Sequence, residues 1–255
     1  MFKVPINDSI EILMAKPLTS LVEFLKYLFT GKGLLGTQVQ QANLVFPSHL
    51  LNENSCISSN NSQSQMDGHN SINIPDTEIM FLPVNPTDKT FDGLAKSYGA
   101  FCYLCTILRP ESVGSVRLAS LNPRDCPISD LGTLSNSNDR IPMRKALRLA
   151  LAMSKSLRDA GYPFEDLQVP ESQTDEDLDT FMQTNIMTTY HYSSTCRMAG
   201  ETDMGVVDDE LRVHGVNGLR IADASIFPKI PACHLQAPVV MVAERCVKFV
   251  TDGHT

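Results

Sequence analysis

The chain has 255 residues, a mass of 28.1 kDa and a formal net charge of −8 at pH 7. Its 42% of hydrophobic and 20% of charged residues are typical of a globular protein with a sizeable core, and they exclude a wholly disordered chain, a collagen and a coiled coil. The apolar runs are far shorter than the roughly 20 residues of a membrane span. The acidic balance, with a pI of about 5.2, argues against a nucleic-acid partner, which needs clustered cations.

The N-terminal residues 1–5 show no signal-peptide pattern, so we expect a cytoplasmic location. The seven cysteines form no small disulfide framework. Cys102 and Cys105 make a lone Cys-x-x-Cys in the apolar segment 101–108, and no second pair completes a set of zinc ligands. We interpret both as buried free thiols and predict no metal site, with metal or redox chemistry as the alternative.

In the first third of the chain, apolar residues at three- and four-residue steps predict a helix over residues 18–30. Gly31 is expected to end this helix, because glycine adopts the left-handed cap without strain. Residues 52–73 are rich in Ser and Asn and almost free of large apolar side chains. We predict that they form a mobile polar insertion at the surface.

Residues 78–82, 101–108 and 114–119 are predicted strands, separated by Pro, Gly and Asn turns. An amphipathic helix follows over 141–159. The acidic run 175–179 is expected to open another helix as a solvated first turn near the positive end of its dipole.

Two histidines in the C-terminal part lie in loops next to structured segments. A histidine there can act as a general base near neutral pH, and the alternative for His191 and for His234 is a structural hydrogen bond. Asp223 follows a predicted strand over 219–222, where a carboxylate either meets a ligand hydroxyl or caps the next turn. The final helix, about 237–250, begins with Ala-Pro; its N-terminus either stabilises negative charge on a ligand or is simply capped.

This C-terminal part resembles the signature of the glucose–methanol–choline family of flavin-dependent oxidoreductases. The matching stretches are His191 with Thr195–Met198, Val207–Asp208, Leu211–Val216, Gly218–Arg220, Asp223–Ser225 and the start of the last helix at Ala237–Pro238. Weaker similarity to the family's substrate-domain segments extends back to residues 31–34, 114–118 and 122–123.

The resemblance implies that His191 acts as base toward a substrate hydroxyl while a hydride leaves for flavin, and that His234 orients the resulting alkoxide. The His-x-Gln arrangement of His234 and Gln236 is similar to the fungal aryl-alcohol oxidase branch. The resemblance further implies FAD as cofactor, with Asp223 and Ala224 along the dinucleotide. Leu235 and Gln236 correspond to contacts near the isoalloxazine ring.

The sequence departs from the family pattern at Ser194 and Ala199, where the family has glycines. We also expect the family's N-terminal dinucleotide-binding half, with its Gly-x-Gly-x-x-Gly motif, to be absent from this chain.

The predicted fold class is α+β. An antiparallel-sheet substrate domain backed by helices spans 1–202, and the C-terminal strand and helix of a flavin-binding domain span 203–255. The predicted function is FAD-dependent oxidation of a small alcohol, without a membrane partner and with a separately encoded N-terminal half as a possible partner. The alternatives are a non-catalytic degenerate fragment and a lyase or cyclase that contains flavin.

Overall fold

The computed structural model describes residues 1–40, 42–56, 73–86 and 97–252. The chain forms two compact units. The first comprises Met1–Ile107 and Ile141–Ile186, and the second comprises Leu108–Arg140 and Met187–Thr255. Within the described ranges, no helix is long and apolar enough to cross a membrane.

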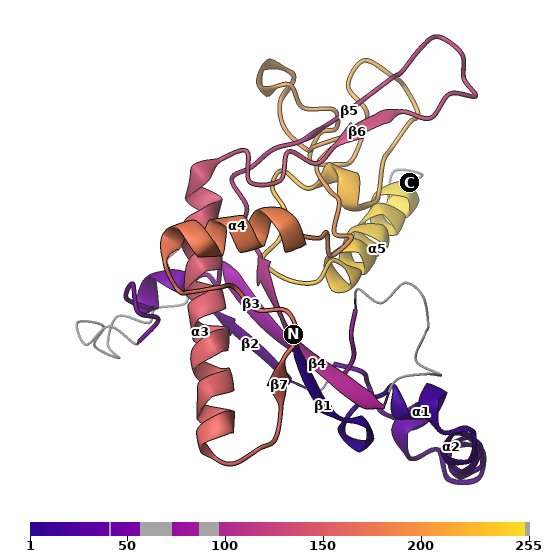
Figure 1. Cartoon of the computed structure of the whole chain (residues 1–255). Coiled ribbons are helices and arrows are strands. Elements are labelled where there is room, and N and C mark those ends of the chain that lie inside the picture. The colour runs from indigo at the N-terminus through magenta and orange to yellow at the C-terminus, as the bar shows by residue number, and fades with distance from the viewer. Residues whose placement is uncertain (41, 57–72, 87–96, 253–255) are drawn as a thin grey trace. The chain divides into compact units, whose positions relative to one another are not determined.

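The first unit is built on a five-stranded antiparallel sheet (Figure 1). In spatial order its strands are β2 (Ala42–Phe46), β3 (Thr77–Leu82), β4 (Tyr98–Ile107), β1 (Phe2–Pro5) and β7 (Glu165–Asp166). The predicted strands 78–82 and 101–108 are confirmed as β3 and β4. The sequence analysis did not identify the other three strands.

Aromatic side chains cover one face of this sheet. Phe2 of β1 lies opposite Phe101 of β4, and directly opposed residues of an antiparallel pair share a face. Their ring centroids are 5.0 Å apart, and Phe164 lies 5.0 Å from Phe2. Phe81 of β3 and Tyr103 of β4 extend the same cluster. This cluster anchors the N-terminal strand between β4 and β7.

Two helices of this unit are joined by charged side chains. They are α3 (Arg140–Asp159) and α4 (Asp175–Asn185), at the positions expected from the sequence. Arg144 donates to both carboxylate oxygens of Asp179, at 2.7 and 2.6 Å, and Arg148 donates to Asp175 at 2.5 Å. The acidic run is therefore more than the solvated helix start that we expected, because two of its carboxylates bind arginines of α3.

The first unit also contains α1 (Ile12–Ala15) and α2 (Pro17–Thr30), the predicted helix 18–30. Gly31 ends α2 in the left-handed conformation, as expected. The polar side of α2 contacts its own unit: the Glu23 carboxylate accepts the Leu34 N–H at 2.7 Å, which lowers the Glu23 pKa, and Ser20 donates to the Leu13 carbonyl.

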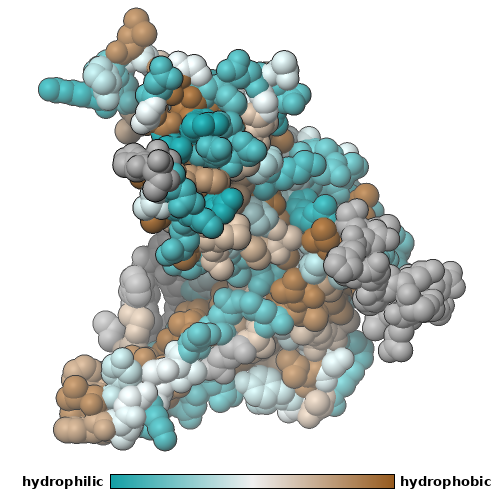
Figure 2. Space-filling model, turned by 180° about the vertical axis from the view of Figure 1, so that it is seen from behind, coloured by the Kyte–Doolittle hydropathy of each residue, from teal (hydrophilic) through white to brown (hydrophobic). Residues whose placement is uncertain are grey.

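The apolar residues of α2 are exposed instead of buried. Exposed side chains include Leu18, Leu21, Val22, Phe24, Leu25, Leu28 and Phe29, the last at 80%. They contribute to the brown area at the lower left of Figure 2. The helix thus has the reverse of the usual amphipathic arrangement, in which the apolar stripe faces the core.

The letters Gly-x-Gly-x-x-Gly do occur in the chain, from Gly31 to Gly36, which corrects the expectation that this motif is absent. A dinucleotide-binding turn joins a strand to a helix. Here the three glycines follow helix α2 and lead, through the short 3-10 turn Leu34–Gly36, toward strand β2. The spacing alone therefore does not create a dinucleotide-binding turn.

The predicted polar insertion 52–73 is described only in part, because residues 57–72 lie outside the described ranges. Its first residues pack more closely than we expected. Ser55 is buried, and its hydroxyl donates to the Lys145 carbonyl of α3 at 2.8 Å.

Cys102 and Cys105 lie on β4, three residues apart, so their side chains point to opposite faces of the strand. Burial raises the pKa of Cys102 to about 11 and that of Cys105 to about 12. Both are free thiols, as predicted, but only Cys102 is fully buried, and Cys105 is half-buried. Neither is a reactive thiolate at neutral pH.

We therefore expect iodoacetamide at pH 8 to label Cys102 and Cys105 about 10²-fold or more slowly than the exposed Cys126, because alkylation requires the thiolate. Peptide mass spectrometry after timed quenching measures the three rates. Equal rates in the folded chain would contradict burial of the pair, and equal rates in urea provide the control.

The second unit contains the hairpin β5 (Ser115–Arg117) and β6 (Ile128–Asp130) and ends in α5 (Gln236–Asp252). The hairpin confirms the core of the predicted strand 114–119. The predicted strand 219–222 is wrong. Only Arg220 forms a bridge there, to Arg212, and a single bridge does not make a strand.

Candidate active site

The segments that contain His191 and Asp223 are joined side by side in the second unit. Three backbone N–H groups of the first segment donate to three successive carbonyls of the second. These bonds run from Ser194 to Ala224 (3.2 Å), from Cys196 to Ser225 (2.9 Å) and from Met198 to Ile226 (2.7 Å). Two stretches that are distant in the sequence thus form one backbone framework.

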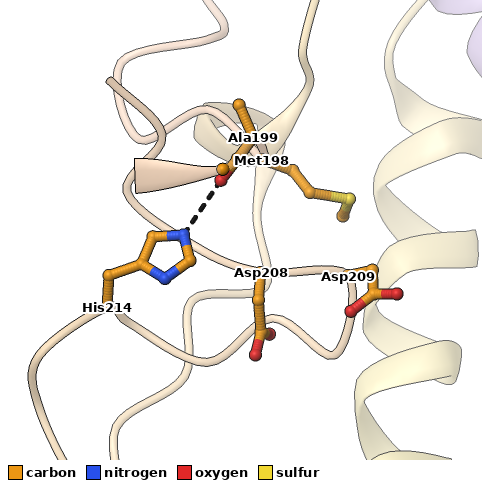
Figure 3. A pocket seen from close by; sticks show the side chains of 6 residues that line it. Met198, Ala199, Asp208, Asp209 and His214 are labelled. Atoms are coloured by element: carbon orange, nitrogen blue, oxygen red, sulfur yellow. Dashed lines mark hydrogen bonds between the residues drawn. The ribbon is translucent and has the colours of Figure 1, made fainter. Parts of the chain in front are cut away.

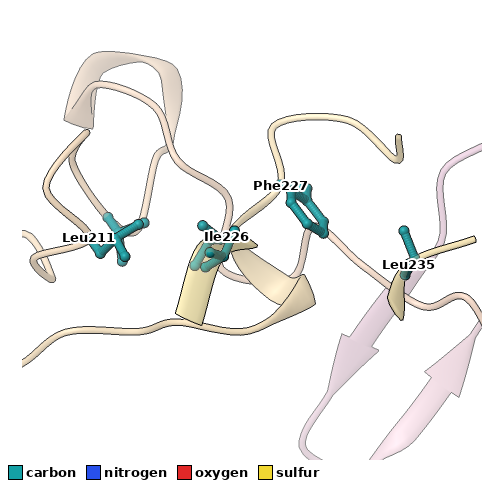
Figure 4. Close-up of a cluster of buried hydrophobic side chains, with 6 residues drawn as sticks. Leu211, Ile226, Phe227 and Leu235 are labelled. Carbon is teal, nitrogen blue, oxygen red and sulfur yellow. The ribbon is translucent and has the colours of Figure 1, made fainter. Parts of the chain in front are cut away.

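A hydrophobic cluster supports this framework (Figure 4). Its buried members are Val207, Leu211, Ile226, Phe227, Leu235 and Val242. Ile226 lies at the end of the short 3-10 turn Ala224–Ile226, and Leu235 immediately precedes α5. The core therefore fixes both the turn after Asp223 and the start of the last helix.

His191 and His234 contact each other. Nδ1 of His234 lies 3.0 Å from Nε2 of His191, and the ring centroids are 4.9 Å apart with the planes at 62°. His191 is half-buried, whereas His234 is exposed. The structure thus brings together the two residues for which the sequence suggested chemistry, although 43 positions separate them.

The hydrogen bonds assign the proton positions of the pair. Nδ1 of His191 lies 2.5 Å from the Thr189 carbonyl oxygen, which can only accept. Nδ1 of His191 therefore has the proton, and in neutral His191 the lone pair is on Nε2. Nε2 then accepts the N–H from Nδ1 of His234. The sequence analysis did not identify the role of the Thr189 carbonyl.

Asp223 acts as a cap in this structure. Its carboxylate oxygen Oδ1 accepts the Ser225 N–H at 2.8 Å at the start of the 3-10 turn, and its side chain is exposed. This is one of the two roles left open by the sequence. Ala224 is half-buried and packs against the hydrophobic cluster.

Leu235 and Gln236 differ in what they present at the start of α5. Leu235 is 8% exposed and its side chain belongs to the cluster, so a ligand can meet only its backbone. Gln236 is exposed and is the first residue of α5. The first N–H groups of a helix have no intrahelical acceptor and lie at the positive end of its dipole. This end of α5 therefore favours a negatively charged group.

Ser194 has a left-handed backbone, with φ of 70°. This explains why a glycine suits the position, since a side chain in this conformation costs roughly 1–2 kcal/mol. Ala199 has no such conformation, but its carbonyl accepts a hydrogen bond from the ring Nε2–H of His214 at 2.9 Å.

Because of that strain, Ser194→Gly is expected to raise the free energy of unfolding by about 0.5–1 kcal/mol, the relief being partly offset by the greater freedom of glycine in the unfolded chain. Urea denaturation measures the change. Ser193→Gly is the matched control, because Ser193 is outside the set of positive-φ residues, and it should be neutral or destabilising. A destabilised Ser194→Gly chain would contradict the left-handed backbone.

A pocket in this unit is lined by neither His191 nor His234 (Figure 3). Its lining residues are Met198, Ala199, Gly200, Asp208, Asp209 and His214. The ring of His214 binds the Ala199 carbonyl, so this histidine joins two loops. We place the candidate active site at His191 and His234, because the chemistry predicted from the sequence lies there.

Comparison with known proteins decides the family. The sequence profile described as GMC oxidoreductase matches residues 110–243, which is more than half of the chain. The chain belongs to the GMC oxidoreductase family. Both histidines lie within the matched residues.

The curated relatives of this GMC protein include oxygen-dependent choline dehydrogenases. The Brucella ovis protein is 35% identical over 178 residues, which cover 68% of this chain and 32% of the relative. The Chromohalobacter salexigens protein is 39% identical over 139 residues, covering 54% of this chain and 25% of the relative. The chain thus spans about a third or less of the length of these relatives.

Solved structures share the fold. Formate oxidase from Aspergillus oryzae superposes with a TM-score of 0.75 at 22% identity, over 99% of this chain and 45% of its own. A fungal aryl-alcohol oxidase superposes with a TM-score of 0.51 at 25% identity, over 71% of this chain and 28% of its own. These matches confirm the α+β fold predicted from the sequence.

Proposed function

We propose that this chain provides the substrate side of a FAD-dependent alcohol oxidoreductase in which His191 is the base and the substrate is a small alcohol. The observation that carries this proposal is the contact between His191 and His234, whose ring nitrogens lie 3.0 Å apart. His234 comes two residues before Gln236, the first residue of α5. The relatives named as choline dehydrogenases support an alcohol as substrate.

The lone pair on Nε2 of His191 is the atom that takes the hydroxyl proton. As the substrate O–H bond breaks, its proton moves to Nε2, and the carbon–oxygen bond becomes a carbonyl as the carbon loses a hydride. When FAD is bound, it supplies the acceptor for that hydride. The Thr189 carbonyl then stabilises the protonated His191 through the bond at Nδ1.

His234 has a different task in this proposal. Its Nδ1–H points at Nε2 of His191, the position where a substrate hydroxyl must enter. A hydroxyl that enters between the two rings takes over both partners: it donates to His191 and accepts from His234. The hydrogen bond that His234 donates to the substrate oxygen strengthens as negative charge develops on that oxygen.

The residues present suit one part of FAD. The first turn of α5, beginning at the exposed Gln236, suits the charged edge of the ring system. Ala224 packs against the same hydrophobic cluster as Leu235, the residue before α5. A strand–turn–helix of the dinucleotide-binding kind does not occur within the described ranges. We therefore assign residues 1–202 to the substrate domain and 203–255 to the flavin-binding side, with the diphosphate site on another polypeptide segment.

The isolated chain is accordingly expected to bind FAD weakly or not at all. Purification from cells grown with riboflavin, followed by absorption spectroscopy and a fluorescence titration with FAD, measures this. Stoichiometric FAD on the isolated chain would contradict the assignment of the diphosphate site.

Complementation tests the function itself. The chain is co-expressed with the part of the Brucella ovis choline dehydrogenase that it does not match, and the complex is assayed with choline and with aryl and aliphatic alcohols. We expect FAD to co-purify and an alcohol to reduce it. A complex that binds FAD but is reduced by no alcohol would favour the lyase or cyclase alternative, and absence of FAD from the complex would favour the degenerate fragment.

A further inference from the structure

The residue before His191 has an unusual backbone. Tyr190 has a φ of 61°, in the left-handed region that large side chains rarely adopt. Its N–H donates to the Thr188 hydroxyl at 2.9 Å. The same peptide group, which joins Thr189 to Tyr190, brings the Thr189 carbonyl to within 2.5 Å of Nδ1 of His191. The left-handed turn is thus the local geometry in which a histidine ring reaches a carbonyl two residues earlier.

The side chain of Tyr190 does not explain this conformation. It is 77% exposed, and its ring contact is an edge contact with Tyr192 at 6.5 Å between centroids. A bulky exposed residue in a left-handed conformation costs roughly 1–2 kcal/mol without returning it through burial. What this position contributes is therefore its backbone.

We propose that the left-handed turn at Tyr190 is a positioning device that fixes the tautomer and orientation of His191. With the proton on Nδ1, the lone pair of His191 lies on Nε2, which faces Nδ1 of His234. In the other tautomer, the lone pair of Nδ1 would face the Thr189 carbonyl oxygen, and neither atom could donate. The turn thus selects the tautomer in which the base is able to take a proton.

This inference rests on the proposed function only for the role of His191 as a base. The tautomer of His191 is the same property of the chain with or without a substrate. The test uses the full 255-residue chain without flavin. Long-range ¹H–¹⁵N spectra of the histidine rings are recorded at pH 8, above the reference histidine pKa of about 6.5. These spectra report which ring nitrogen of each histidine has the proton.

The decisive variant is Tyr190→Val, because a β-branched residue is disfavoured in the left-handed region. We expect the ratio of the Nδ1–H to the Nε2–H form of His191 to fall roughly 5- to 30-fold, the factor that corresponds to 1–2 kcal/mol. Tyr190→Gly should keep the wild-type tautomer, since glycine tolerates a positive φ. The matched control is Tyr192→Val, which makes the same Tyr-to-Val change at a residue outside the left-handed turn. It should leave the tautomer of His191 unchanged.

Thr188→Val and Thr189→Ala form a second pair, in case Tyr190→Val does not fold. Thr188→Val removes the hydroxyl that accepts the Tyr190 N–H and should shift the tautomer in the same direction. Thr189→Ala keeps the backbone carbonyl and should not. Folding of each variant is checked by its thermal unfolding midpoint.

A folded Tyr190→Val or Thr188→Val chain with the wild-type tautomer of His191 would overturn the inference. In the complemented enzyme, Tyr190→Val should lower kcat with little change in KM, and Tyr190→Gly should restore it. If the tautomers behave as expected but no complemented enzyme oxidises an alcohol, the positioning device stands and the proposed function fails.

Discussion

In the complex that contains FAD, His191→Ala is expected to slow reduction of the flavin by an alcohol about 10²- to 10⁴-fold, the usual contribution of a positioned general base. The variant removes the lone pair that takes the hydroxyl proton and leaves the Thr189 carbonyl without its donor. Stopped-flow absorbance of the flavin measures the step directly, before turnover adds product release.

Substitutions of two other histidines provide the comparison for His191→Ala. His234→Ala should also slow reduction, because the developing alkoxide loses a donor. His214→Ala is the control, because the His214 ring binds the Ala199 carbonyl and neither histidine of the pair. It should lower the unfolding midpoint and leave the rate of flavin reduction nearly unchanged. If His191→Ala reduced flavin as fast as the wild type while His214→Ala did not, the assignment of the base would be wrong.

The helices were predictable because their signals are local. Apolar periodicity predicted α2 and α3 close to their observed bounds. The acidic run indicated the start of α4, and the Ala-Pro start indicated α5. The orientation of a helix is not local. The spacing that predicts α2 does not show which side of the helix faces its own unit. In the structure, Glu23 on the polar side binds the Leu34 N–H, whereas Phe29 is exposed.

Strands were harder to predict where pairing is long-range. β1 and β7 are short, and they pair with each other across more than 160 positions, so no nearby turn signals them. The segment 219–222 has the apolar composition of a strand, yet only Arg220 finds a bridging partner. Composition measures how well a segment fits a sheet, whereas pairing depends on which neighbour is present.

For the candidate site, the sequence predicted the residues but not their contacts. His191 and His234 were found through the family resemblance, and their direct contact needed the framework between residues 194–198 and 224–226. The Thr189 carbonyl is a backbone group, which no residue type reveals. The left-handed turn at Tyr190 has no glycine to signal it, so it became visible only in the structure.

The framework depends on its core, and Ile226→Ala is expected to show how strongly. Ile226 is 2% exposed, lies among the buried side chains drawn in Figure 4, and has the carbonyl that accepts the Met198 N–H. Truncation of a buried isoleucine removes apolar contacts and leaves a cavity, which typically costs about 2–5 kcal/mol. Urea denaturation of the isolated chain, followed by a signal from the second unit, measures this loss in the free energy of unfolding.

The matched control is Ile128→Ala, the same substitution in the same unit at a side chain that is 59% exposed on β6. It should change the free energy of unfolding by less than about 0.5 kcal/mol. Amide hydrogen exchange adds a local measurement: in Ile226→Ala the N–H groups of Cys196 and Met198 should exchange faster, because their acceptors lie on the turn that Ile226 anchors. Equal urea midpoints for the two variants would contradict a core that supports the histidine segment, since the buried and exposed isoleucines would then contribute alike.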